Sequence, residues 1–180
     1  AEAVIKVLKE LMEDHGNVVF SGDGYSAEWH EMAVSERGLK NIPTTADALP
    51  ALREASVKKL FESAGVLTPV ELESRFEVYA EQYILSIDVE AKLVVDIAKT
   101  RIYPAAIHYL SDLAKTSESL AAMGIELDSS TATVVANEIN AMMSAVAELI
   151  DAMGKHDFTS IEEHMHFCAN EIRSLMDKVR

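Results

Sequence analysis

Residues 68–109 read TPVELESRFEVYAEQYILSIDVEAKLVVDIAKTRIYPAAIHY, a segment with few residues that break a helix. Thr68 is suited to cap a helix, Pro69 to occupy its first position and Glu71 to complete a capping box. Apolar side chains then recur every three or four residues as far as Tyr109, which favours one very long helix. From residue 69 to 123 it would measure roughly 80 Å if unbroken. Pro104 must kink or interrupt it, because proline lacks an N–H and clashes with the preceding turn.

Two more helices are predicted after the long one, and their apolar seams match. The connector between them, residues 154–158, is short, so we expect an antiparallel hairpin with the long helix as a third wall. A capping box of Thr159 and Glu162 is expected to start the second helix. The seams consist of Val135, Ile139, Met142, Val146, Leu149 and Met153 in the first helix, and Ile161, Met165, Cys168, Ile172, Leu175 and Val179 in the second.

The helix predicted over 130–153 is rich in Ala and Met nearly all round, and no Lys or Arg occurs between Lys115 and Lys155. The simpler interpretation is a central bundle helix with little exposed surface. The alternative is that a second face of this helix packs on another subunit.

Most glycines and prolines occur early in the chain, which indicates an irregular N-terminal third. We expect an amphipathic helix over 2–13, at most one short strand at 18–20, a helix capped by Ser26 and ended by Gly38, and a further helix over 45–63. The fold class is therefore mainly α, an antiparallel helical bundle. We divide the chain into an N-terminal part, 1–66, and a helical bundle, 67–180.

The charge excludes several classes of function. The 30 acidic residues against 16 basic ones give a formal charge of −14, so the chain lacks the basic surface of a nucleic-acid binder and is not attracted to an anionic membrane. A hydrophobic content of 49% argues against a disordered chain. The single Cys168 permits no internal disulfide, and no apolar run is long enough to span a bilayer. We expect a cytoplasmic protein.

The loop Ser21-Gly22-Asp23-Gly24 follows the possible strand and precedes a helix, an order typical of phosphate-binding loops. It lacks a lysine, and Asp23 would repel phosphate, so a structural turn is favoured.

Glu71 and Glu73 resemble a metal-binding pair. They lie two residues apart at a helix start, however, and point to different sides, where acids favourably oppose the helix dipole.

His164, His166 and Cys168 lie within five residues, just after Glu162 and Glu163. Zinc needs three or four converging ligands, and Cys168 lies on the apolar seam, where a free thiol acts as a small hydrophobic group. The aromatic residues Tyr79, Tyr83, Tyr103, Tyr109 and Trp29 are more typical of a core than of a ligand pocket. We therefore assign no catalytic, cofactor-binding or metal-binding residue in this sequence.

An ordered series of short motifs resembles the C-terminal region of type III glutamine synthetases, the long-chain form found mainly in bacteria. The resemblance covers roughly residues 4 to 113. It rests on VVFSGDGYS at 18–26 with Glu28-Trp29, Arg37-Gly38-Leu39 with Asn41, TTADALPAL at 44–52, Leu60-Phe61, Gly65-Val66-Leu67, Glu71-Leu72, Ser74-Arg75, Glu77, Ile87, Glu90-Ala91-Lys92, DIAKT at 96–100 and Pro104-Ala105-Ala106-Ile107.

The resemblance implies a parent enzyme that makes glutamine from glutamate, ammonia and ATP with divalent Mg or Mn. It places the catalytic motifs upstream, so this chain resembles an excised, non-catalytic C-terminal segment. The family forms ring-based oligomers, which implies subunit packing as the role, with the catalytic domain and neighbouring subunits as partners and residues 1–66 abutting that domain. Two alternatives stay open: an independent regulatory bundle binding a small ligand or metal at His164–Cys168 or at the tyrosines, and a chain that is itself an enzyme.

Overall fold

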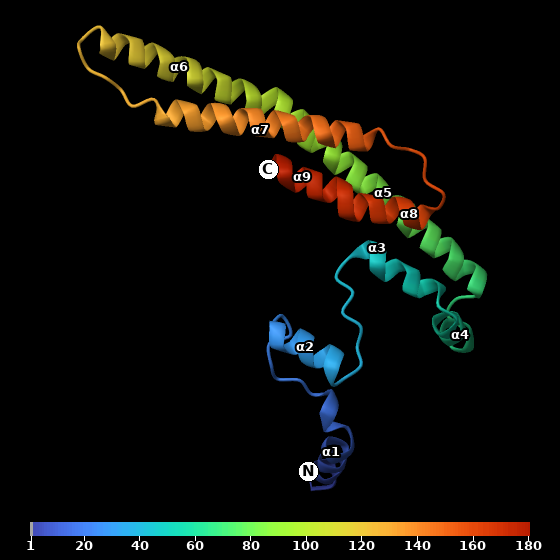
Figure 1. The fold of residues 1–180 in the computed structure, drawn as a ribbon. Coiled ribbons are helices and arrows are strands. Elements are labelled where there is room, and N and C mark those ends of the chain that lie inside the picture. The colour runs from blue at the N-terminus through green and yellow to red at the C-terminus, as the bar shows by residue number, and fades with distance from the viewer. Residues whose placement is uncertain (1) are drawn as a thin grey trace. The chain divides into compact units, whose positions relative to one another are not determined.

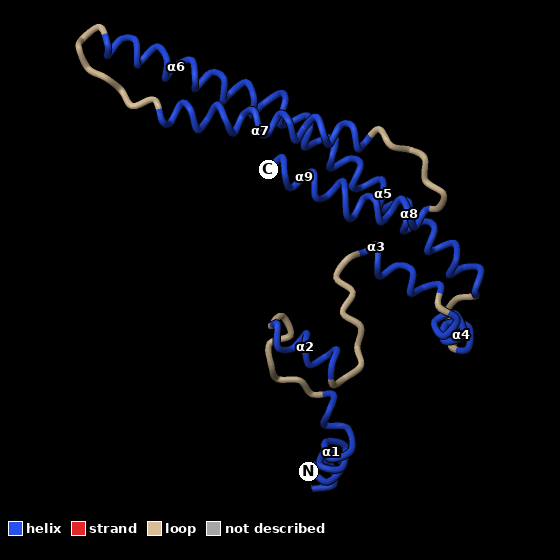
Figure 2. The backbone as a smooth tube through the Cα atoms, in the orientation of Figure 1, coloured by secondary structure: helices blue, strands red, loops and turns tan. Residues whose placement is uncertain are grey.

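The computed structural model describes residues 2–180, and throughout that range the backbone forms helices, turns and loops without a strand (Figures 1 and 2). The chain divides into two compact units, Ala1–Ile42 and Pro43–Arg180. The mainly α fold class is therefore confirmed. The division at residue 66 stays a prediction. None of the described helices is long and apolar enough to cross a membrane.

The first unit contains helix α1 (Glu2–His15), a 3-10 turn (Gly16–Val18) and helix α2 (Ala27–Ser35). Ser26 caps α2 as expected, because its Oγ accepts a hydrogen bond from the Trp29 N–H at 3.1 Å. The possible strand at 18–20 does not form, which agrees with the expectation of at most one. Val18 ends the 3-10 turn, and the next N–H, that of Val19, bonds back to the Gly16 carbonyl at 3.0 Å. A single strand has no partner for its backbone groups, so a local turn satisfies them instead.

The second unit begins with helix α3 (Thr45–Ala48), the 3-10 turn η2 (Leu49–Arg53) and helix α4 (Ala55–Ser63). We expected a single helix over 45–63, and this prediction is wrong. Pro50 cannot donate a backbone hydrogen bond, and the segment tightens into a 3-10 turn there. Glu54 is then extended, with φ −61° and ψ 137°, which separates α4 from the turn.

The long helix is present and runs from Pro69 to Ala121 without a loop (Figure 2). Its capping box is confirmed: the Thr68 Oγ1 accepts from the Glu71 N–H at 3.3 Å, and the Glu71 carboxylate accepts from the Thr68 N–H at 2.8 Å. Pro104 interrupts the α-helical hydrogen bonding but not the helix. Helices α5 (Pro69–Ile97) and α6 (Tyr103–Ala121) are joined by the π-turn η3 (Ala98–Ile102). The wider turn accommodates the proline ring, which would clash with a carbonyl four residues back.

The hairpin predicted on either side of the connector 154–158 is also present. Its first helix, α7 (Ser130–Met153), returns along α6 (Figure 1). Its second helix consists of α8 (Ile161–Phe167), the π-turn η4 (Cys168–Ile172) and α9 (Arg173–Val179), and it lies along α5 and α7. The expected capping box is displaced by one residue. Ser160 caps α8, its Oγ accepting from the Glu163 N–H at 3.1 Å, while the Glu163 carboxylate accepts from the Thr159 N–H at 2.8 Å. Adjacent Thr and Ser followed by adjacent Glu residues permit either register.

The predicted seams form the core of the second unit. Its larger cluster includes Ile87, Ala91, Ala98, Val146, Leu149, Cys168, Ile172, Met176 and Val179. A smaller cluster of Ala46, Phe76, Ala80 and Met165 joins α3 to α5 and α8. The antiparallel bundle predicted from these spacings is therefore confirmed.

Helix α7 is not the enclosed central helix of the simpler interpretation. Its main contacts within the described residues are with α5, η3, α6 and the last helix, and its other side is exposed. The exposed residues there include Val134, Asn137, Ala141 and Ser144. Whether a second subunit covers this side stays a prediction.

Candidate functional site

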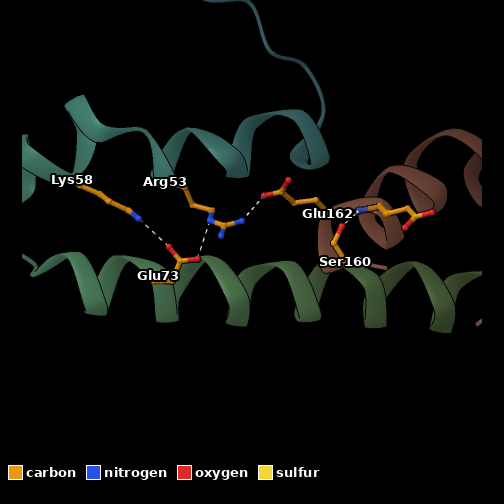
Figure 3. A network of polar contacts seen from close by, with 6 residues as sticks. Arg53, Lys58, Glu73, Ser160 and Glu162 are labelled. Atoms are coloured by element: carbon orange, nitrogen blue, oxygen red, sulfur yellow. Dashed lines mark hydrogen bonds and ion pairs between the residues drawn. The ribbon is translucent and has the colours of Figure 1, made fainter. Parts of the chain in front are cut away.

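An ionic junction joins four elements of the second unit (Figure 3). Arg53, at the end of η2, bridges two carboxylates: its Nε lies 2.8 Å from Oε1 of Glu73, and its Nη1 lies 2.6 Å from Oε1 of Glu162. Lys58 of α4 lies 3.0 Å from the other Glu73 oxygen. The guanidinium also covers the buried Phe76 ring, 4.8 Å from its centroid. The junction therefore holds α3–α4 against α5 and α8 by charge and by packing.

Glu71 and Glu73 do not form a carboxylate pair. Glu71 belongs to the cap, where hydrogen bonds from the Thr68 backbone and side chain lower the pKa of its carboxyl. Glu73 takes part in the ionic junction with Arg53 and Lys58. The two acids thus have separate structural contacts, and the junction role of Glu73 has no local signal in the sequence.

The loop at 21–24 has the contacts of a structural turn. The Asp23 Oδ1 accepts from the Tyr25 N–H at 2.9 Å, so an acidic group occupies a backbone donor of the loop. Next to the loop, the Phe20 and Trp29 rings pack with their centroids 4.3 Å apart.

His164, His166 and Cys168 point to different neighbours. The His164 ring stacks on Phe158 with centroids 4.1 Å apart, and the His166 Nδ1 lies 3.6 Å from the Asp47 carboxylate. Cys168 is buried in the core, where burial and then Asp88 raise the pKa of its thiol to about 11. Among residues 2–180, no group of three or more His, Cys, Asp or Glu side chains could hold a metal ion.

The tyrosines do not line a common pocket. Only Tyr83 is half-buried, and burial raises the pKa of its hydroxyl while the Arg173 charge partly opposes that shift. Tyr79, Tyr103 and Tyr109 are exposed. The expectation of core tyrosines is wrong for these three, whose side chains are exposed.

Sequence reasoning missed a cavity of about 440 Å³ in the second unit, here called the α5–α8 cavity. It lies between α5, the connector 154–158 and α8. Its apolar lining includes Ile84, Leu85, Ile87, Met153, Phe167 and Ile172, and its titratable residues include Glu81, Asp88, Lys92, Lys155, His156 and His164. The one sequence signal was Lys155, which ends the segment without basic residues. An apolar cavity with a few polar groups is the usual form of a small-molecule site.

Apolar seams and an ionic junction close a bundle of helices, so the second unit is a helical domain. Residues 3–121 match the model of the glutamine synthetase C-terminal domain. The chain belongs to that family, and the resemblance seen over residues 4 to 113 is confirmed.

Curated relatives agree with this assignment. The type-3 glutamine synthetase of Dictyostelium discoideum is 41% identical over 115 residues, which cover 64% of this chain and 16% of the relative. A glutamine synthetase of Bacteroides fragilis (strain YCH46) is 30% identical over 156 residues, 84% of this chain and 21% of the relative. One of Butyrivibrio fibrisolvens is 34% identical over 114 residues, 63% of this chain and 16% of the relative. The chain therefore spans about a fifth or less of the length of these relatives.

Proposed function

We propose that this chain is the non-catalytic C-terminal segment of a type III glutamine synthetase, and that it packs on the catalytic part and joins neighbouring subunits into an oligomer. The longer protein would be a cytoplasmic enzyme that ligates ammonia to glutamate at the expense of ATP, with Mg or Mn. The family assignment and the relatives named glutamine synthetases support this proposal. So does the small share of their length that the chain covers.

The observation that carries the proposal is an uncovered apolar face on α5. Its members recur seven and then four residues apart, and Val78, Leu85 and Val89 lie on the side of the helix opposite the core residue Ile87. Contiguous apolar surface of this kind usually marks a protein interface. This face, the α5 stripe, consists of Val78, Leu85, Val89, Leu93 and Ile97, all exposed in this chain.

The N-terminal unit supplies a second uncovered face. Helix α1 buries none of its residues, although Val4, Val7, Leu8 and Leu11 recur on one side at helical spacing. An amphipathic helix gains stability in water mainly by burying such a face. We propose that residues 1–66 abut the catalytic domain and that α1 is covered there.

The test uses the full-length parent protein. Deletion of residues 66–180 should reduce the number of subunits in the oligomer, obtained by light scattering from the molar mass of the oligomer and of its chain. Leu93→Glu should do the same because it places a charge in the α5 stripe. Ser174→Glu, an exposed position on α9, is the matched control and should leave the mass unchanged. An unchanged subunit count in both the deletion and Leu93→Glu would contradict the assembly role.

The parent's activity is tested separately. The full-length protein should form glutamine from glutamate, ammonia and ATP with Mg, whereas the 180-residue chain should not. Glutamine formation by the chain alone would show that it is itself an enzyme, which would contradict the non-catalytic assignment.

The alternative, an independent regulatory or ligand-binding bundle, is favoured by one observation, the α5–α8 cavity. It would require the isolated chain to bind a small molecule whether or not it assembles. A metal-binding version would require a ligand set, and the described residues provide none at one place.

A further inference from the structure

We infer that the α5–α8 cavity binds a small amphipathic carboxylate, with the apolar body of the ligand inside the cavity and its carboxylate against Lys155, His156 and His164. This inference concerns a cavity lined by this chain's own helices and the connector 154–158. It does not depend on the assembly role proposed above.

The cavity suits an apolar body of limited size. Its volume of about 440 Å³ lies within the range typical of small-molecule sites, roughly 300–1,000 Å³. Ile87 and Ile172 form part of its lining and also belong to the buried core, so this side of the cavity is built from packed helices. A hydrocarbon chain placed there would exchange water contacts for contacts with aliphatic and aromatic side chains.

The connector side of the cavity carries a positive charge in a defined position. The Lys155 Nζ lies over the Phe167 ring, 5.5 Å from its centroid, and Phe167 itself lines the cavity. Within residues 2–180, Lys155 forms no ion pair with an acidic side chain. An ammonium held at an apolar cavity by an aromatic ring is therefore ready to receive an anion.

The two histidines extend this basic edge. The His164 ring is nearly parallel to that of Phe158, at an interplanar angle of 11°, which fixes the position of the imidazole. Burial, and then the neighbouring His156, lower the pKa of His164, while the Asp88 charge partly opposes that shift. A ligand carboxylate placed beside both rings would offset that repulsion and accept hydrogen bonds from them.

Two acidic residues also line the cavity and bear on the sign of the ligand's charge. Glu81 and Asp88 on α5 are acidic, but the Asp88 carboxylate already accepts from Lys92 Nζ at 2.6 Å. A cationic ligand would compete with Lys92 for that carboxylate and would be repelled by Lys155. A carboxylate ligand faces the connector and leaves the Asp88–Lys92 pair intact.

The experiment titrates octanoate into the 180-residue chain and follows the methyl signals of Ile and Met by NMR. The expected result is a saturable shift of Ile84, Ile87, Ile172 and Met153. Octanamide, with the same hydrocarbon length and no charge, should bind about tenfold more weakly or worse, and octylamine should not bind. The absence of saturable shifts up to about 10 mM octanoate would overturn the inference. So would equal affinity for octanamide, or shifts centred on Ile97.

Two lysine variants test whether the charge of Lys155 binds the ligand carboxylate. Lys155→Gln should weaken octanoate binding about tenfold, with octanamide binding unchanged. Lys115→Gln on α6 removes the same charge away from the cavity and should leave both affinities unchanged. Both lysines are exposed, and circular dichroism would check that the helices are retained. Equal octanoate affinity in the two variants would contradict the role of Lys155.

Discussion

Leu149 shows what a single seam residue contributes. It is fully buried where α7 meets α9 and the long helix. Leu149→Ala should lower the free energy of unfolding by about 2–5 kcal/mol, because it removes buried methyl groups and leaves a cavity. Urea denaturation measures this loss.

The control for that substitution is Val134→Ala on the same helix, since Val134 is 58% exposed. Its effect should stay within about 0.5 kcal/mol. Equal losses for the two variants would mean that the seam of α7 is not the side that packs in this chain.

Cys168 should be unreactive in the folded chain. Its pKa of about 11 leaves almost no thiolate at neutral pH, and the side chain is only 4% exposed. Iodoacetamide at pH 7.5 should leave Cys168 unmodified in the native chain and label it fully in urea, as read by mass spectrometry. Rapid native labelling would contradict the burial of the η4 turn in the bundle.

At the scale of elements, the helix caps formed by Glu71 and Glu163 make the stability of the folded chain depend on pH. Hydrogen bonds to Thr68 and Thr159 lower the pKa values of Glu71 and Glu163 in the folded chain. Each of these carboxyl groups therefore adds to the free energy of unfolding when the pH is above its pKa in the unfolded chain, near 4.5. This contribution is lost as the pH falls through the lower pKa of the folded chain. Stability to urea should therefore fall below about pH 4.5.

The Glu71→Gln, Glu163→Gln double variant tests this cause. Its loss of stability between neutral and acidic pH should be smaller than that of the unsubstituted chain. The matched control, Glu77→Gln at an exposed position on α5, should keep the full acid dependence. If the double variant and the control behave alike, other carboxyl groups cause the acid dependence.

Local signals predicted the elements best where they act within one turn. Thr68, Pro69 and Glu71 lie within four residues, and the helix begins where they indicate. The contact between Arg53 and Glu162 joins residues 109 apart and left no local pattern. The segment 45–63 failed because a single Pro50 outweighed the helix propensity on both sides of it. The cavity was missed because its lining comes from helices that meet only in three dimensions.

At the scale of the whole molecule, the two units meet in the chain near Ile42, in a segment without helix between Ser35 and Thr45. Limited digestion of the 180-residue chain with trypsin should cut first after Arg37 or Lys40, because exposed irregular backbone is cleaved more readily than helix. The fragment that contains residues 43–180 should persist, as judged by mass spectrometry. A first cut after Lys155, within the bundle, would contradict the expectation that the segment between Ser35 and Thr45 is cleaved more readily than the bundle.

The π-turn η3 also has a consequence for how this sequence varies among its relatives. A π-turn places one more residue in a helical turn than an α-helix does, and it rotates everything beyond it about the helix axis. Removing one residue between 98 and 102 would restore regular α-helix, provided that no proline followed at 104. Homologous chains that lack this proline are therefore expected to carry a one-residue deletion at that place, with the spacing of apolar residues on either side preserved.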